Sequence, residues 1–164
     1  MNKAKSASVG ANNNSGSVGI ESVADILERE RSNTITDWLA RVEAEPGLNS
    51  IQLSHADRTG HLPQLLNDVI VRLRLDTGTH APISAAAATH GDLRHKQGYT
   101  VALVVEESRL LQVSIFTMLH NNVKQIDFPS LLPSVITIAD EVDAQLKQQM
   151  LRFMAAEHRN NNSC

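Results

Sequence analysis

Aliphatic side chains recur at intervals of three and four residues through most of this sequence, and this spacing constrains the fold more than any other feature. Such spacing places the apolar residues on one face of an α-helix. Hydrophobic residues make up 41% of the 164-residue chain but aromatic residues only 3%. The core therefore consists of Leu, Ile, Val and Ala, which suits helix packing better than a β-sandwich. We expect one all-α domain, a helical bundle of four to five helices.

The same periodicity divides the chain into expected helices. They cover residues 22–44, a segment from about Pro63 to just before Asp76, residues 84–120 with a kink near Gly98, and residues 130–157. The last of them would be roughly 40 Å long at 1.5 Å per residue.

Both ends of the chain differ in composition from the middle. Residues 1–20 are rich in Ser, Gly and Asn and have almost nothing to bury, which predicts a disordered tail. We expect the helical domain to span residues 21–158 and residues 159–164 to form a frayed end.

Charge and composition exclude several classes of protein. The net charge is −3 and no basic block is present, which disfavours a nucleic-acid partner. No apolar run reaches the roughly 20 residues of a membrane span, and no secretory signal is visible, so we expect a cytoplasmic protein. His55 and His61 are six residues apart and His90 and His95 five, so neither pair has helical metal-ligand spacing. We expect no metal, no cofactor and, without a nucleophile–base pair, no catalysis.

The segment from residue 90 to residue 106 is the most unusual part of the chain. On a continuous helix His90, Arg94 and Gln97 share one otherwise apolar face, while Tyr99 and Glu106, seven apart, share a second. We predict that these five residues form a ligand-binding or signal-sensing site.

Two glycines, Gly91 and Gly98, interrupt this helical pattern, and each costs about 1 kcal/mol relative to Ala. A bend or a close packing contact would explain at least one of them.

Other functions remain open for this segment. His90 and Arg94 would serve a purely structural role by capping a neighbouring helix or pairing with an acidic residue. Haem ligation by His90 or His120 would make the protein a globin-like haem sensor. A histidine phosphotransfer role for His90 is a further alternative, although Leu93 and Arg94 follow one residue later than that motif requires.

The final helix carries a stripe of apolar residues at near-heptad spacing. A stripe longer than a compact bundle can cover is an association surface, so we expect a homodimer seam or an output helix here. Its residues are Val135, Val142, Leu146, Met150 and Phe153.

The pattern His90-Gly91, Arg94, Gly98-Tyr99, Leu103 and Glu106, set before a long final helix, resembles the N-terminal sensor domain of the RsbRD-type RsbT co-antagonists. That family is also found at the front of bacterial sensor histidine kinases. The resemblance covers about residues 22–155. It implies a helical input domain that passes a signal from an unidentified small molecule or other stimulus to a downstream signalling domain or protein.

Overall fold

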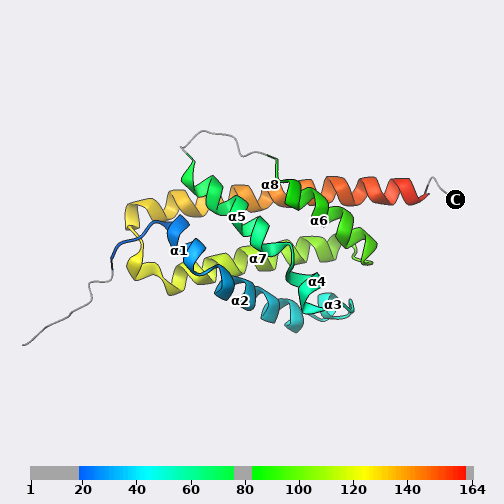
Figure 1. Cartoon of the computed structure of the whole chain (residues 1–164), viewed down its shortest axis with the longest axis horizontal. Coiled ribbons are helices and arrows are strands. Elements are labelled where there is room, and N and C mark those ends of the chain that lie inside the picture. Colours follow the sequence, from blue (N-terminus) through cyan, green and yellow to red (C-terminus); the bar gives the residue numbers. More distant parts are fainter. Residues whose placement is uncertain (1–18, 76–82, 162–164) are drawn as a thin grey trace, which may run out of the picture.

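The computed structural model describes residues 19–75 and 83–161, which form α-helices joined by short turns (Figure 1). The all-α prediction is confirmed: within these ranges the only strand-like feature is an isolated bridge between Glu21 and Ile126. The helices are α1 (Val23–Arg29), α2 (Arg31–Ala44), α3 (Pro46–Asn49), α4 (His55–Thr59), α5 (Leu62–Arg74), α6 (Ala85–Lys96), α7 (Val101–Asn121), the 3₁₀ turn η1 (Val123–Gln125) and α8 (Phe128–Asn161).

Short polar residues begin several of these helices. The side-chain oxygen of Ser84 accepts a hydrogen bond from the backbone N–H of Ala87, and the side chain of Thr100 accepts one from Leu103. Each of these bonds satisfies a backbone donor that has no partner within the first turn of a helix. The local sequence thus fixes where α6 and α7 begin.

Two of the expected helices are divided in the structure. The expected helix over residues 22–44 is split at Glu30, which ends α1 and begins α2. The expected helix over residues 84–120 is split between α6 and α7, where Gly98 adopts a φ of +80°. Only glycine adopts this left-handed conformation without strain, so Gly98 terminates α6.

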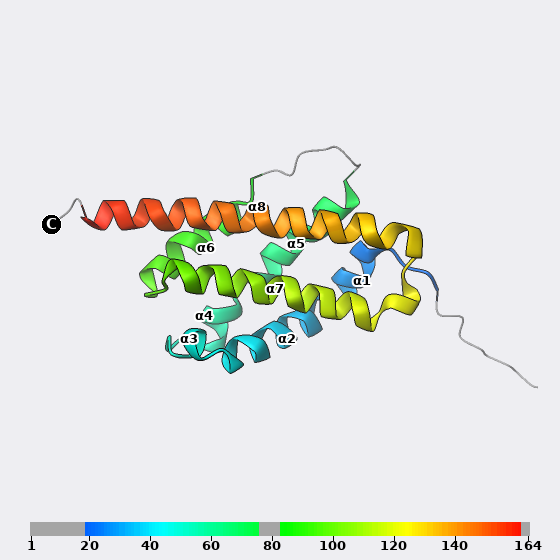
Figure 2. The same ribbon diagram turned by 180° about the vertical axis from the view of Figure 1, so that it is seen from behind.

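The long helices α7 and α8 run antiparallel and side by side (Figure 2). Helix α2 packs along α7, while α5 and α6 lie against α8 on the face opposite to that seen in Figure 2. With 34 residues, α8 is roughly 50 Å long. Its last turns project beyond the other helices in both views.

The core lies between these helices and is aliphatic, as the composition predicts. Its largest fully buried apolar side chains are Trp38, Phe153, Ile26, Leu27, Leu48, Leu62, Leu66, Ile70, Ile115 and Ile138.

The apolar stripe of the final helix faces this core. Val142 and Phe153 are 2% and 1% exposed, and Val135, Leu146 and Met150 are partly buried against the core. The expectation that this stripe is left uncovered is therefore wrong, because α8 supplies one wall of the bundle. The exposed large apolar side chains of α8 are Phe128, Leu132, Ile136, Leu151 and Met154.

The described residues include only part of the two terminal segments that the sequence predicts. Most of the expected tail over residues 1–20, and residues 162–164 of the expected frayed end, lie outside the described residues. Residues 159–161 continue α8 as regular helix instead of fraying. In the described ranges, no helix combines the length and the apolar character that a membrane span needs.

Candidate functional site

Helix α6 reaches α8 through Gly91, which is buried. A Cβ atom at this position would lie 2.9 Å from both Cα and the carbonyl carbon of Gln149 in α8, and closer still to its carbonyl oxygen. Only glycine allows the two backbones to approach in this way. One turn of α6 is thereby fixed against the middle of α8, and the neighbouring residue His90 is placed inside the bundle.

The carboxylate of Glu107 on α7 is the centre of a buried polar cluster. Its Oε1 accepts hydrogen bonds from Arg94 Nη2 at 2.7 Å and from the Tyr99 hydroxyl at 3.2 Å. Its Oε2 accepts from Arg94 Nε at 2.9 Å and lies 3.1 Å from His90 Nε2. Arg94 and Glu107 are 0% and 3% exposed, so this ion pair is removed from water. We call His61, His90, Arg94, Tyr99 and Glu107 the polar centre.

Arg94 also joins the polar centre to α4. Its guanidinium donates to the backbone carbonyls of Asp57 at 3.3 Å and Arg58 at 2.9 Å, which belong to the last turn of α4. It donates a further bond to the side-chain oxygen of Gln97 at 2.6 Å. A cation at the C-terminal end of a helix satisfies carbonyls that have no partner within the helix. Arg94 thus serves both structural roles that the sequence left open, helix capping and pairing with an acid.

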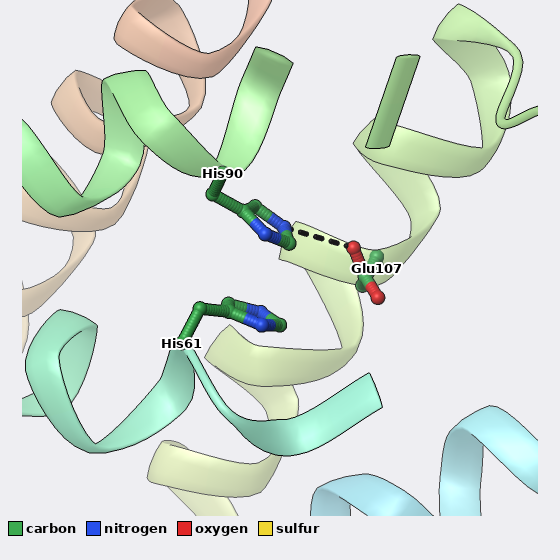
Figure 3. Close-up of side chains that lie close together, drawn as sticks. All are labelled: His61, His90 and Glu107. Carbon is green, nitrogen blue, oxygen red and sulfur yellow. Dashed lines mark hydrogen bonds and ion pairs between the residues drawn. The ribbon is translucent and has the colours of Figure 1, made fainter. Parts of the chain in front are cut away.

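His61, at the start of α5, stacks on His90 (Figure 3). The ring centroids are 3.6 Å apart and the planes differ by 18°. Nδ1 of each ring is buried and has no hydrogen-bond partner in the structure as described. A buried polar atom without a partner is costly, so these two nitrogens mark a place where an additional group would be stabilised.

A small cavity adjoins the stacked rings. Its volume is about 10 Å³, and its polar lining comes from His61, His90, Glu107, Ser108, Gln145 and Gln149. This is close to the smallest space that holds one water molecule. A separate, open depression of about 460 Å³ on the surface is also lined by His61 and His90.

The environment sets the ionisation of these groups. Burial, reinforced by the charge of Arg94, holds the pKa of His61 well below its usual value, and burial also lowers the pKa of His90. Burial alone would raise the pKa of Glu107, but the hydrogen bond from His90 and the charge of Arg94 outweigh it and leave this pKa lowered. Burial and the Glu107 carboxylate raise the pKa of Tyr99 to about 12. At neutral pH Glu107 is therefore ionised and both imidazoles are neutral.

A neutral His90 must donate from Nε2 to Glu107, because a carboxylate only accepts hydrogen bonds. This assigns the tautomer from the partner and leaves the lone pair of His90 Nδ1 unused.

The structure brings four of the five predicted site residues together. His90, Arg94, Gln97 and Tyr99 lie in or against the polar centre. Glu106 does not: its side chain is 27% exposed and pairs with Arg109. The carboxylate in the polar centre belongs to Glu107, the residue after the predicted Glu106. The break at Gly98 rotates the side-chain directions of α7 relative to those of one continuous helix, and this turns Glu107 inward.

Sequence reasoning did not place His61 or Glu107 in the site. Glu107 could have been found, since it shares a face of α7 with the buried residues Val104 and Leu111. His61 carries no such signal, because it precedes His90 by 29 positions and meets it only through the packing of α5 on α6.

The polar centre bears on two of the open alternatives. His90 is only 2% exposed, which leaves no access for a phosphoryl donor protein. The cavity beside it is of water size and has no room for a porphyrin, and His120 lies on the surface. These geometries favour neither phosphotransfer nor haem ligation by His90.

Comparison with family models, with curated proteins and with solved structures finds no match to this chain.

Proposed function

We propose that this chain is the signal-sensing input domain of a bacterial signal-transduction protein. The signal leaves through α8 toward a histidine kinase or a stressosome-type output module, as the resemblance to the RsbRD-type sensor domains implies. The observation that supports this proposal is the polar centre itself. It is a buried ionic network that α5, α6 and α7 share, and α6 is in backbone contact with α8.

A network of this kind costs stability relative to apolar side chains of the same volume. Burying Arg94 and Glu107 carries a desolvation penalty that their attraction only partly offsets. Two imidazole nitrogens that find no partner among the described residues add to that cost. Stability given up in this way is consistent with a role other than packing, and we propose that the network lets the bundle switch between two arrangements.

The route from the polar centre to the output is short. A displacement of the α6 backbone at His90 would also displace Gly91, the next residue. Because Gly91 lies so close to the backbone of Gln149, such a displacement would push on α8. Helices in close contact slide or turn as rigid bodies, so the change reaches the projecting end of α8.

We propose in addition that the domain is a homodimer. The apolar side chains Leu132 and Ile136 are 67% and 62% exposed, one turn apart on α8, and Phe128, one turn earlier, is 80% exposed. An exposed apolar row of this kind favours self-association. In a dimer the two α8 helices would carry the signal together.

The experiment makes a small change in the polar centre and measures its effect on hydrogen exchange in α8 and on the activity of a kinase joined to α8. Tyr99→Phe removes the 3.2 Å hydrogen bond to Glu107 without a change in shape, at a cost of about 1 kcal/mol. Glu106→Gln is the matched control, because it alters the neighbouring carboxylate on the outer face of α7. Both variants are compared with the wild type by hydrogen exchange, and as inputs joined through α8 to the catalytic part of a sensor histidine kinase.

If the chain is an input domain, Tyr99→Phe should change the rate of hydrogen exchange in the last three turns of α8 and the autophosphorylation rate of the joined kinase. Glu106→Gln should change neither. Exchange changes confined to α6 and α7, with unchanged kinase activity, would contradict the proposed function.

A further inference from the structure

The geometry points to a binding site for a divalent first-row transition-metal ion, formed by His61 and His90 and by Glu107. The idea that this ion is the stimulus of an input domain rests on the proposed function. The binding of the ion does not.

The three side chains meet the requirements of a metal site in type and spacing. Two imidazoles and one carboxylate are ligands that zinc, iron, copper and nickel accept. One ligand atom from each lies within 4.8 Å of the other two. His90 Nε2 and Glu107 Oε2 are 3.1 Å apart, close to the distance of about 3.3 Å between adjacent ligands of a tetrahedral zinc ion.

Space and access are also present. The water-sized cavity beside the rings has room for a solvent ligand, which gives three protein ligands and one open position. The surface depression that His61 and His90 also line supplies a route for the ion. His61 is the most exposed of the three ligands and stands between this depression and the interior.

Arg94 and Tyr99 act as supports for the carboxylate. They hold Glu107 through three hydrogen bonds, which is how carboxylate ligands are oriented in metal sites. The ion would take the place of the proton that now lies between Nε2 and Oε2, and that proton would move to Nδ1 of His90, so that the imidazole stays neutral. The charge of Arg94 already compensates Glu107, so the site favours modest, reversible affinity over permanent occupation.

Metal binding would change the packing of the polar centre. The stacked rings are nearly parallel, so their nitrogen lone pairs point in similar directions and do not converge. His61 must turn out of the stack to share an ion with His90. Since His61 precedes the first turn of α5, this movement couples the ion to the relative position of α5 and α6.

The test uses the full chain, freed of metal with EDTA, and titrates Zn²⁺ by calorimetry and Co²⁺ by visible absorption. His61→Phe keeps an aromatic ring against His90 and removes the ligand nitrogens, and His61→Ala is the second variant. His55→Ala is the matched control, because His55 is exposed and lies 2.9 Å from Glu43. Circular dichroism checks that each variant is folded.

We expect one ion per wild-type chain and the strong absorption of four-coordinate Co²⁺. Both His61 variants should bind at least about tenfold more weakly, and His55→Ala should bind as the wild type does. No binding by the wild type, or equal binding by the His61 variants, overturns the metal site.

Hydrogen exchange of α8 separates this inference from the proposed function. If Zn²⁺ binds through His61 but leaves exchange in α8 unchanged, the ion is not the stimulus. If Zn²⁺ does not bind while Tyr99→Phe still alters α8, the proposed function stands and the metal inference fails.

Discussion

Substitution of Gly91 by Ala tests the contact between α6 and α8 directly. Intrinsic helix propensity predicts that Gly91→Ala stabilises the protein by up to about 1 kcal/mol, because Gly91 lies inside α6. The structure predicts the opposite sign. The added methyl group would collide with backbone atoms of Gln149. Neither the methyl group nor the helical backbone can rotate away, so the clash is relieved only if the helices move apart.

The magnitude follows from how far the helices must separate. Carbon atoms in contact lie about 3.5–4.0 Å apart, so a separation of 2.9 Å requires α6 and α8 to move apart by roughly 1 Å. Overpacking of this kind typically costs about 1–3 kcal/mol, and a clash with rigid backbone belongs at the upper end. A net loss of about 2–3 kcal/mol corresponds to a fall in Tm of about 5–10 °C for a chain of this size.

Thermal and urea unfolding measure this loss. Thr89→Ala is the control, because Thr89 is exposed on the same helix and Ala there gains propensity without a clash. Gly98→Ala provides a second comparison: within the described part of the chain no atom lies within 4 Å of its added Cβ, so only the strain of φ +80° destabilises that variant, by about 1 kcal/mol. A Gly91→Ala protein as stable as Thr89→Ala would refute the close approach of the two backbones.

Three further predictions concern stability and association. Arg94→Ala should cost about 3–5 kcal/mol in urea unfolding, because it leaves the buried Glu107 carboxylate without its cation; a loss below about 1 kcal/mol would contradict the buried ion pair. Burial raises the pKa of Glu141, so its ionised form destabilises the fold above the unfolded pKa of about 4.5, and this cost disappears as the pH falls below that value. Glu141→Gln should therefore raise Tm at pH 7 but not at pH 4, and an equal gain at both values would exclude this cause. Phe153→Glu should unfold the protein, whereas Leu132→Glu should leave it folded and weaken the dimer in sedimentation; a wild type that is monomeric at tens of micromolar would remove the dimer proposal.

The helices were predictable where apolar periodicity is strong and unbroken. Helix α5 begins and ends within about two residues of the expected limits, since Pro63 and the Leu/Val/Ile spacing act together. The splits at Glu30 and Gly98 were not predicted as breaks. Glycine is tolerated in helices as well as at their ends, so the sequence alone does not say which role Gly98 has.

The site was predictable on one helix only. His90 and Arg94 are one turn apart on α6, and their shared direction follows from helix geometry. Their partners depend on how α4, α5 and α7 pack, which no local pattern encodes. The choice of Glu106 over Glu107 failed for a different reason: α6 and α7 were expected to be one helix, whereas the buried face of α7 through Val104 and Leu111 indicates Glu107.

The position of α8 in the chain affects how the protein folds during synthesis. The helices that form the polar centre, α4 to α7, leave the ribosome before α8, so the ion pair can assemble while its outer wall is still missing. Val142 and Phe153, which complete the core, are added only when the last described helix is made. Until then the apolar faces of α5, α6 and α7 remain open to solvent and to other chains. Slow synthesis through α8, or truncation within it, should therefore expose the protein to aggregation and to chaperone binding.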